Sequence, residues 1–488
     1  MQNLIHYLLM LDSNLMNTST NKSLLITFFT AFSLLAASCQ KWLDVKPEDK
    51  FTKEQIYQTP EGVKEVMNGI YLRLGSEKLY GSYLSMTVLD VMAQRYRIGS
   101  DKNPYYYYSN YSFNEKKVQD GLADIWTDMY VTIGNINDFI KILPTVNNGL
   151  TQEQKDQYIG EAIGIRAFLH FDLLRMFGNY YDETTKTEEA IPYYRTLSTD
   201  IEPFSSSEMV ISYILEDIAE AERLMAKDPI IGKTGLDDLN NNRFHLYAAK
   251  ALKARVYHWA NEKGKAYQTA KEVIALQDAF PWVKHADITI SGKDTDRKFF
   301  SENIFSVFNP DLYDIQLNTF DGNLLEGDLL ATGSSNAISK VYENNESDYR
   351  YTYLWPYATA GIGYRTFIKY VDLVNKDNLS RYMVPLIRIS EMYYIAAECA
   401  ENPTEGLTYL NTVRQHRNII TDITNPSILK NELTKEYRKE FYGEGQLWYY
   451  YKRSKITSIM SMTANGSNTT ISLTNYKLPI PQVELNGR

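Results

Sequence analysis

The chain has 488 residues, of which 44% are hydrophobic and 13% aromatic, and its formal net charge at pH 7 is −9. This length and apolar content suffice to bury large cores, so a disordered chain is not expected. The sequence contains no block of basic residues, which excludes a nucleic-acid partner on electrostatic grounds. Tyr is the most frequent aromatic residue, with 39 copies against 19 of Phe. Because a Tyr ring can sit half in water, this surplus predicts wet aromatic surfaces as well as a core.

Residues 1–38 have the layout of a secretory signal peptide. Lys22 precedes an apolar run of about fourteen residues that starts at Leu24, which is too short to span a bilayer comfortably. Met16 is an alternative start, because residues 1–15 add nothing that such a signal needs. No other run long enough to cross a membrane follows in the sequence.

The end of this signal resembles a bacterial lipobox. Ala36, Ala37 and Ser38 stand directly before Cys39. The resemblance implies that Cys39 becomes the lipidated first residue of the mature chain and is anchored by acyl chains. The sequence departs from the usual pattern at Ala36, where lipoproteins usually carry Leu. An ordinary signal cleaved near Ala37 or Ser38 is the alternative.

After the signal, the chain divides into a tether, a helical body and an insertion. Residues 39–59 are expected to form the lipidated N-terminus and tether, and residues 60–278 and 381–488 the helical repeat body. Residues 279–380 are rich in Gly, Asn, Ser and Asp, and no helix longer than three turns is expected there. Irregular insertions in rigid helical arrays often carry binding loops, so residues 279–380 are expected to form a ligand-binding insertion.

The stretch from Gly160 to Gly178 predicts the central helix of the body. Its apolar residues cover nearly the whole circumference, so other elements must cover it on two sides. Thr151 and Gln154 have the spacing of a capping box at its start. We therefore expect an inner helix of a stacked helical array.

Later stretches repeat a pair of helices of similar size. Residues 246–260 and 266–276 form one pair, and residues 387–400 and 406–417 form another. Such pairs are typical of degenerate tetratricopeptide-like repeats, whose stacking buries the faces that a single pair leaves exposed. A last helix is expected over 432–453, with a charged stripe along it.

Two segments combine aromatic residues with loop composition. Helical periodicity fails between Arg95 and Phe113, where four consecutive Tyr follow Pro104, and the insertion adds further aromatics. An aromatic ring can stack on the apolar face of a sugar, and planar polar side chains can bond to its hydroxyl groups. The candidate ligand-binding residues are Tyr105, Tyr106, Tyr107, Tyr108, Trp282, Tyr313, Trp355 and Tyr357. For each aromatic, packing of its loop onto the helices is the alternative.

Other polar and aromatic residues receive different roles. The candidates for hydrogen bonds to a ligand are Asn103, Asn110, Asp311 and Arg365. The tryptophans at core spacing on predicted helices are assigned to the core: Trp126, Trp259 and Trp448. The charged residues of the central helix are expected to pair in structural networks: Glu161 with Arg166, and Asp172 with Arg175.

The sequence contains no catalytic, metal-binding or cofactor-binding motif. Its six histidines are scattered, and no pair has the His-Glu-x-x-His spacing of a zinc site. No P-loop and no Gly-x-Ser-x-Gly elbow is present. A glycosidase needs only two carboxylates roughly 5–10 Å apart, so composition cannot exclude one among 60 acidic residues.

The motifs along the chain, in their order, resemble the SusD/RagB family of Bacteroidetes outer-membrane lipoproteins. The resemblance rests on LAASC and LDVKP near the start, WTDMYVTIGNIN at 126–137, GEAIGIRAFLHFDLLRMFG at 160–178, AAKALKARVY at 248–257, IRISEMYYIAAECA at 387–400, LNTVR at 410–414, EYRKEFYGEGQLWYYYKR at 436–453 and LPIP at 478–481. It implies a right-handed array of degenerate tetratricopeptide-like helix pairs with a variable, loop-rich region. It also implies capture of oligosaccharides or other nutrients at the cell surface, over a SusC-type TonB-dependent transporter. The chain departs from the family's export signal, because Gln40, Lys41 and Trp42 replace acidic residues after Cys39.

We therefore expect a mostly α-helical protein that is lipid-anchored in the outer membrane, faces the cell exterior and delivers a bound oligosaccharide to that transporter. No catalytic residue, metal or cofactor is expected. Two alternatives stay open. One is a surface-anchored glycoside hydrolase on an α-helical scaffold, and the other is a non-catalytic scaffold or adhesin whose aromatic loops serve packing only.

Overall fold

The computed structural model describes residues 53–198, 200–233, 240–290, 294–325 and 327–488. Its contacts divide the chain into two units, Met1–Ile56 and Tyr57–Arg488. In the first unit the described residues form the short helix α3 (Lys53–Ile56). The predicted signal peptide, Cys39 and residues 39–52 of the tether lie outside the described residues. The second unit contains all the elements discussed below.

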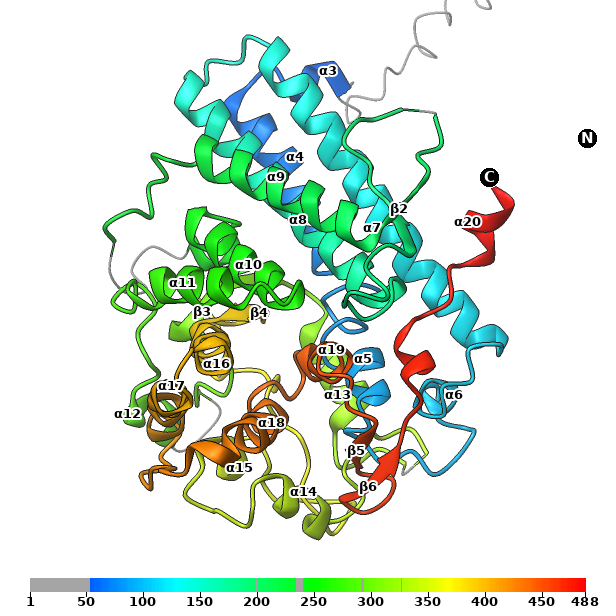
Figure 1. Ribbon diagram of the computed structural model, residues 1–488, viewed down its shortest axis with the longest axis vertical. Helices are drawn as coiled ribbons and strands as arrows, with labels where there is room; N and C mark the ends of the chain where they lie inside the picture. Colours follow the sequence, from blue (N-terminus) through cyan, green and yellow to red (C-terminus); the bar gives the residue numbers. More distant parts are fainter. Residues whose placement is uncertain (1–52, 199, 234–239, 291–293, 326) are drawn as a thin grey trace, which may run out of the picture. The chain divides into compact units, whose positions relative to one another are not determined.

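The second unit is mostly α-helical (Figure 1). Its helices are α4 (Pro60–Leu74), α5 (Val88–Met92), α6 (Tyr106–Ser109), α7 (Lys116–Ile142), α8 (Gln152–Phe177), α9 (Ser207–Leu224), α10 (Leu246–Trp259), α11 (Lys263–Ile274), α12 (His285–Thr289), α13 (Leu312–Phe320), α14 (Ser335–Val341), α15 (Tyr349–Thr352), α16 (Ile389–Cys399), α17 (Pro403–Gln415), α18 (Leu429–Glu440), α19 (Gln446–Arg453) and α20 (Gln482–Asn486). The predicted fold class is confirmed. Among the described residues, no helix has the length and apolar content needed to cross a membrane.

The strands form three small antiparallel sheets of two strands each. They are β1 (Glu189–Pro192) with β2 (Phe204–Ser206), β3 (Asn303–Phe308) with β4 (Met383–Arg388), and β5 (Ser458–Ser461) with β6 (Ser467–Thr470). The second sheet pairs a strand inside the insertion with a strand just after it, with Phe308 opposite Met383. This sheet therefore joins the insertion to the first residues of the helical body that follow it.

Helix α8 is the inner helix that the sequence predicts. Its capping box is formed, because Gln154 N donates to Thr151 Oγ1 over 3.2 Å and Thr151 N donates to Gln154 Oε1 over 3.0 Å. Every residue from Gly160 to Phe177 is buried. Helices α7 and α9 both pack against α8, as Figure 1 also shows. The apolar circumference is thus covered on two sides, as expected.

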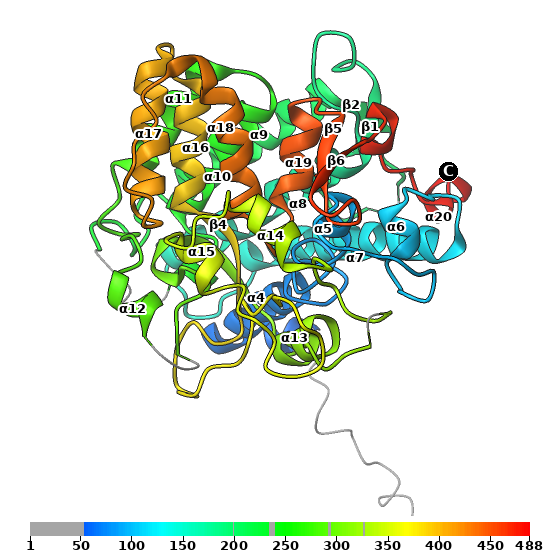
Figure 2. The same ribbon diagram turned by 90° about the horizontal axis from the view of Figure 1, so that it is seen from below.

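The predicted helix pairs are α10 with α11 and α16 with α17. The insertion separates the two pairs in the sequence, yet α11 packs directly on α16. In Figure 2 helices α9, α10, α11, α16, α17 and α18 lie side by side in the upper part of the view, and α12 to α15 lie below them. The described part of the insertion contains only short helices, of which α13 has nine residues. The described residues of 279–380 therefore differ from the helices around them in carrying only short helices.

The expected unbroken helix over 432–453 is wrong, because two glycines interrupt it between α18 and α19. Gly443 and Gly445 have φ of +75° and +69°, which is the left-handed region that favours glycine. A Cβ atom at Gly445 would lie 2.3 Å from the carbonyl oxygen of Leu84. This close approach explains why the chain turns here.

The expected charged stripe is present on α18, and Glu436 and Glu440 on this helix and Glu444 just after it are buried in an ion-pair network. Glu440 Oε1 lies 2.6 Å from Arg417 Nη2, and Glu440 Oε2 lies 2.9 Å from Arg350 Nη1. Arg388 bonds to the same carboxylate. Burial alone would raise the pKa of Glu440, but Arg417 and Arg388 hold that pKa well below its ordinary value. We call the set the Glu440 network; its members are Glu302, Asp348, Arg350, Lys369, Arg388, Arg417, Glu436, Lys439, Glu440 and Glu444.

The polar partners on α8 differ in part from those expected. Asp172 and Arg175 form the expected i,i+3 pair. Arg166 instead pairs with Asp217 of α9 over 2.8 Å, and Glu161 pairs with Arg243 over 2.9 Å. These partners come from other elements, which spacing along one helix cannot indicate.

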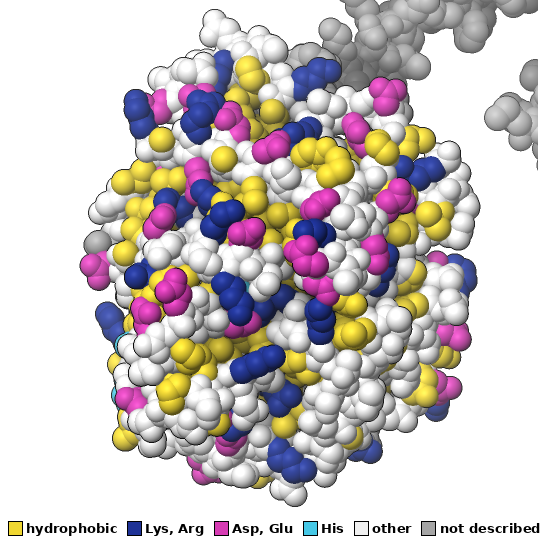
Figure 3. Space-filling view, viewed as in Figure 1, with side chains coloured by type: hydrophobic (Ala, Val, Ile, Leu, Met, Phe, Trp, Pro, Cys, Tyr) yellow, Lys and Arg dark blue, Asp and Glu magenta, His cyan; other side chains and the backbone are white. Residues whose placement is uncertain are grey.

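On the surface, charges of both signs are interspersed. On the face drawn in Figure 3, Lys and Arg side chains alternate with Asp and Glu, and neither sign gathers into a large patch. That face of the described residues therefore offers no electrostatic footprint for a polyanion.

Candidate functional site

A cavity of about 360 Å³ lies where the aperiodic segment after α5 meets the insertion. We call it the loop cavity. Its lining residues are Arg97, Gly99, Ser100, Lys102, Gly327, Leu329, Ala331, Gly333 and Tyr364. A volume of this size lies within the usual range for small-ligand pockets. The cavity is thus built from the two segments that the sequence analysis selects.

The two walls of the loop cavity are joined through their backbones. Arg97 and Ala331 form an isolated antiparallel bridge, in which Arg97 N donates to Ala331 O over 2.7 Å. Gly333 has a φ of +73°, and a Cβ atom there would lie 2.2 Å from Cδ of Arg97. Glycine at 333 therefore lets the stem of Arg97 lie directly against the opposite wall.

A short hairpin in the insertion carries the aromatic side of the site. Tyr357 and Arg365 form an antiparallel bridge, and Ala358 N donates to Tyr364 O over 3.2 Å. Because neighbouring residues of an extended segment point to opposite sides, Tyr364 can line the cavity while Arg365 faces away from it. At the tip, Gly361 has a φ of +76°, and a Cβ atom there would lie 2.0 Å from Gly322 O.

Arg365 holds an exposed tyrosine in place. Its guanidinium carbon lies 4.5 Å from the ring centre of Tyr351 and 4.6 Å from that of Tyr357. Arg365 Nη1 also donates to Trp355 O over 2.7 Å. The stacked cation fixes the Tyr357 ring, of which 58% is exposed. Tyr357 is therefore an ordered aromatic surface on the same hairpin as Tyr364.

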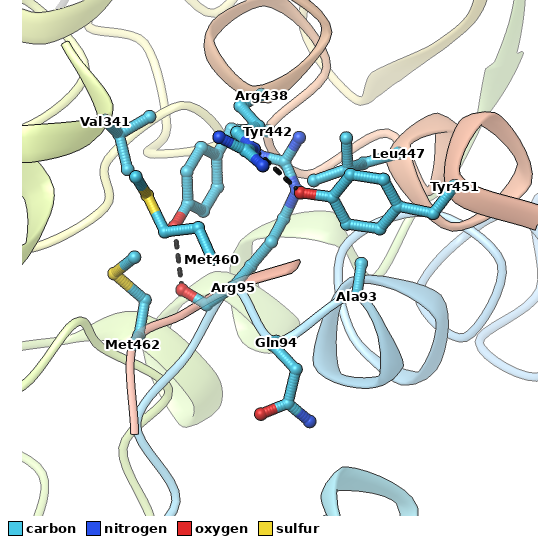
Figure 4. A pocket seen from close by; sticks show the side chains of 10 residues that line it. All are labelled: Ala93, Gln94, Arg95, Val341, Arg438, Tyr442, Leu447, Tyr451, Met460 and Met462. Carbon is cyan, nitrogen blue, oxygen red and sulfur yellow. Dashed lines mark hydrogen bonds between the residues drawn. The ribbon is translucent and has the colours of Figure 1, made fainter. Parts of the chain in front are cut away.

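The segment that carries Arg97 is anchored at Arg95. Tyr442 Oη donates to Arg95 O over 2.7 Å, and the Arg95 guanidinium lies 4.0 Å from the Tyr442 ring centre. Figure 4 shows the pocket around these side chains, with Met460 and Met462 on one side and Tyr451 on the other. This pocket measures about 10 Å³, which is room for about one water molecule and excludes a sugar.

The four consecutive tyrosines do not line the loop cavity. They lie in and just before the short helix α6, which packs against α5 and α7. The side chain of Tyr108 is buried, so the expectation that it contacts a ligand is wrong in this structure. Tyr105, Tyr106 and Tyr107 are half-buried, and the rings of Tyr106 and Tyr107 meet edge to face at 5.4 Å.

For Trp355 the expectation of ligand contact is likewise wrong, because its indole is fully buried. The ring lies 4.8 Å from Tyr442 and 5.0 Å from Phe367, measured between ring centres. Tyr442 comes from a distant part of the chain and Phe367 from the same insertion, and together they turn a loop residue into a core residue.

The two remaining candidates are half-buried and lie apart from the loop cavity's lining. Trp282 stacks on His416 with ring centres 4.5 Å apart. Tyr313 lies 4.8 Å from Tyr382, whose backbone N–H donates to Tyr313 Oη over 3.0 Å. The three tryptophans assigned to the core are buried, which confirms that assignment: Trp126, Trp259 and Trp448.

Sequence reasoning missed the side chains that do line the loop cavity. Arg97 and Lys102 lie within the aperiodic segment. The candidates chosen from this segment were the four tyrosines that follow them. Tyr364 directly follows Gly361, Ile362 and Gly363. An aromatic residue directly after such a glycine-rich tip is the signal that could have identified it.

A second large cavity, of about 690 Å³, lies in the helical body between α4, α8 and α9. We call it the body cavity. Its described lining is mostly charged or amide side chains, and its aromatic rings are the phenol of Tyr158 and the imidazole of His245. Arg243 on its wall bonds to Glu161 and lies 4.6 Å from the ring centre of Tyr71. Burial raises the pKa of Glu161 above its ordinary value, although the nearby Arg243 acts to lower that pKa.

The described residues that line the loop cavity include two cations and no carboxylate. Hydrolysis of a glycoside needs two carboxylates at the bond, so these residues supply hydrogen-bond donors and a ring but no acid–base pair. Within the described ranges, no group of three or more His, Cys, Asp or Glu side chains is arranged to hold a metal ion.

Fold and cavity together define a tetratricopeptide-like helical protein with a loop-lined cavity. Two family models match consecutive parts of the chain. The model described as "Starch-binding associating with outer membrane" matches residues 41–258, and the model of the SusD family matches residues 252–486. The chain belongs to the SusD/RagB family.

Relatives and solved structures agree with this assignment. The chain is 25% identical to SusD-like protein P38 of Formosa agariphila over 88% of this chain and 90% of that protein. A SusD superfamily structure from Bacteroides thetaiotaomicron superposes with a TM-score of 0.69 at 20% identity, covering 88% of this chain and 98% of that one. A structure described as a laminarin-binding SusD-like protein superposes with a TM-score of 0.62 at 18% identity, covering 88% of this chain and 98% of that one. At these identities the structures establish the fold.

Proposed function

We propose that this protein binds an oligosaccharide in the loop cavity without altering it and delivers it to a SusC-type TonB-dependent transporter. The observation that carries the proposal is the loop cavity itself. It joins two loop segments, and its wall contains an aromatic ring at Tyr364 and hydrogen-bond donors at Arg97 and Lys102. A sugar needs this combination, because one face of its ring is apolar and its rim is polar.

The exposed ring of Tyr357 extends the site beyond the cavity. It shares the hairpin with Tyr364 and is oriented by Arg365. An ordered ring loses little conformational entropy when a ligand stacks on it. Because Tyr357 lies directly opposite Arg365 in the hairpin, its ring is on the side that faces away from the cavity. Tyr357 is therefore proposed to contact a part of a longer glycan that extends around the hairpin.

The kind of ligand is proposed from the names of similar proteins. One structural neighbour is described as laminarin-binding, and another, from Bacteroides vulgatus, as a SusD-like carbohydrate-binding protein. Both names refer to those proteins alone. Together with the aromatic wall of the loop cavity, they favour a glycan over a peptide as the ligand here.

The cellular setting is proposed from the sequence and the family. Lipidation at Cys39 would anchor the chain in the outer membrane with its helical body and insertion facing the exterior. A docked transporter would then receive the ligand from the loop cavity. An intact-mass measurement of the mature chain tests this part, because a diacylglyceryl group on Cys39 is expected and its absence would remove the anchor.

A glycan-binding titration tests the site. Purified protein is titrated calorimetrically with laminarihexaose and, separately, with maltoheptaose, and binding of at least one is expected. Replacing Tyr364 by Ala is expected to weaken that binding about 10- to 100-fold, since loss of a central aromatic contact costs roughly 1.4–2.8 kcal/mol.

The control variant is Tyr158→Ala, which removes the phenol ring from the body cavity and is expected to leave the affinity unchanged. Loss of binding with Tyr158→Ala but not with Tyr364→Ala would move the site to the body cavity. Both glycans are also incubated with the protein and analysed for new reducing ends. Enzymatic turnover, abolished by replacing a single carboxylate, would establish the hydrolase alternative instead.

A further inference from the structure

A small cavity in the core of the helical body is lined by hydrogen-bond donors that have no acceptor in the part of the chain that the structure describes. It measures about 30 Å³ and lies between α8, α10, α16, α18 and α19. We call it the core cavity. It is separate from both the loop cavity and the body cavity, because it shares no lining residue with either.

Three donors on the wall of the core cavity lack an acceptor among the described residues. They are Nη1 of Arg255, Nε1 of Trp259 and Oη of Tyr449. All three side chains are buried, with relative exposures of 4%, 3% and 3%. Nε2 of His258, which also lines the cavity, likewise has no hydrogen-bond partner among the described residues. A buried donor without an acceptor lowers the stability of the folded state by about 1–3 kcal/mol. Because three such donors surround one cavity, an acceptor bound inside it would remove this cost.

The geometry of Arg255 shows that its third nitrogen is not needed for pairing. Nε donates to Glu391 Oε1 over 2.7 Å, and Nη2 donates to the same carboxylate and to Leu386 O over 2.9 Å. The carboxylate therefore already has its bidentate partner. Nη1 is left for whatever occupies the core cavity.

The charges around the core cavity favour a negative occupant. Three guanidiniums line it, those of Arg175, Arg255 and Arg453, whereas Glu391 is the only carboxylate among its lining residues. The carboxylates that pair with Arg175 and Arg453 belong to Asp172 and Glu398, which do not line it. The positive ends of these ion pairs thus face the cavity.

The neighbouring histidine supports a positive local potential. Burial lowers the pKa of His258 below its ordinary value, and Arg453 lowers it further. His258 lies 3.3 Å from Glu398, and that carboxylate does not outweigh the other two effects. The site therefore resists an added positive charge.

We propose that the core cavity binds one small inorganic anion, such as chloride, which accepts hydrogen bonds from Arg255, Trp259 and Tyr449. The volume fits one monoatomic anion or about two waters. An anion needs only donors around it, whereas each water must also donate its two protons. The one side-chain amide on the wall, Gln446, already accepts from Arg175 Nη1 over 3.2 Å, so donors outnumber acceptors.

The bound anion would join α10 to α19 next to the central helix. Arg255 and Trp259 belong to α10, and Tyr449 belongs to α19 and lies 3.7 Å from the Arg175 guanidinium of α8, measured to its ring centre. An ion that binds only the folded chain stabilises it in proportion to the logarithm of its concentration. The melting temperature should therefore depend on the halide.

Bromide diffraction tests the occupant directly. Crystals of the full chain are grown in sodium bromide, and data are collected at the bromine absorption edge. An anomalous peak in the core cavity, within hydrogen-bond distance of Arg255 Nη1, Trp259 Nε1 and Tyr449 Oη, is the expected result. Electron density without anomalous signal there would identify water and overturn the proposal.

Melting temperatures test whether the site is occupied in solution. At constant ionic strength, replacing gluconate by chloride at about 100 times Kd is expected to raise the melting temperature by roughly 2–4 °C. Tyr449→Phe removes one donor and keeps the ring, and Trp259→Phe removes one donor and replaces the indole by a smaller aromatic ring. This halide-dependent rise should shrink in both variants.

The matched control is Trp448→Phe. Trp448 is also buried and its Nε1 also lacks an acceptor among the described residues, but it does not line the core cavity. Its halide response should equal that of the unmodified chain. An equal response in all four proteins would show that the effect is unspecific and would contradict the proposal.

Discussion

The insertion contributes residues to two regions of opposite character, the Glu440 network and the loop cavity. In the network, Arg350 and Lys369 are fully buried and bonded to acidic side chains on or just after α18. At the loop cavity, Arg97 and Lys102 are exposed and Tyr364 is half-buried. The frame of the insertion is thus fixed by buried charges, whereas the side chains at its rim are open to solvent.

The two regions should respond differently to substitution. A buried charge whose partner is lost must stay in a medium of low dielectric constant, which costs several kcal/mol. Replacing an exposed rim residue leaves no unpaired charge buried in the folded state, so it does not carry this cost in free energy. Substitutions in the Glu440 network should therefore act on stability, and substitutions at the loop cavity should act on binding.

The largest effect is expected from Arg417→Met. This arginine bonds to Glu302 through Nη1 over 2.8 Å and to Glu440 through Nε over 3.0 Å. Its removal leaves two carboxylates without their main partner and is expected to lower the free energy of unfolding by about 3–5 kcal/mol in urea titrations.

The control is Lys116→Met, which breaks an exposed i,i+4 pair with Asp120 and should change stability by about 0.5 kcal/mol or less. If both variants lost equal stability, the contrast between buried and exposed charges would be refuted.

Lowering the pH is expected to reduce the stabilisation from the Glu440 network. The loss in free energy of unfolding should be slightly smaller than that caused by Arg417→Met. Burial would raise the pKa of Glu436, but Arg350 and Lys439 outweigh it and lower that pKa from 4.5 to about 2. The stabilisation is therefore complete above pH 4.5 and is lost as the pH falls towards 2. Glu436 alone accounts for roughly 3 kcal/mol, to be measured as urea midpoints between pH 5 and pH 2.5.

Two other carboxyl groups, those of Asp90 and Asp296, increase the free energy of unfolding as the pH falls from 7 to 5. Burial raises the pKa of Asp90 and of Asp296 to about 6, so their protonation favours the folded state as the pH falls from 7 to 5. A maximum of stability near pH 5 is expected. Stability that rose steadily down to pH 2.5 would be inconsistent with a charged Glu440 network.

The smallest effect on stability is expected from Tyr357→Ala. Because most of this ring is exposed, the free energy of unfolding should change by less than about 0.5 kcal/mol. Affinity for the glycan that the unmodified protein binds should fall about 5- to 10-fold through loss of stacking. A destabilised variant with unchanged affinity would reverse the roles assigned to rim and frame.

Sequence periodicity predicts the helical body because local residues decide it. The capping box at Thr151, the apolar circumference of α8 and the paired helices around 246–274 and 389–415 all follow from patterns within one element. The two segments that form the loop cavity also follow, since each combines failed periodicity with polar and aromatic residues.

The individual site residues could not be predicted, because contacts between distant segments decide them. Trp355 and Tyr364 are both aromatic residues of one loop, yet Tyr442 and Phe367 bury the first, and only the second lines the cavity. In the same way, the turn at Gly445 is fixed by the distant Leu84. Such partners are invisible to spacing along the chain.

A crystal structure of the protein with the oligosaccharide that it binds in calorimetry tests the central claim most directly. We expect a sugar ring that stacks on Tyr364 and lies within hydrogen-bond distance of Arg97, between residues 97–102 and 327–333. A glycan bound in the body cavity against Tyr158, with the loop cavity free of sugar, would contradict it.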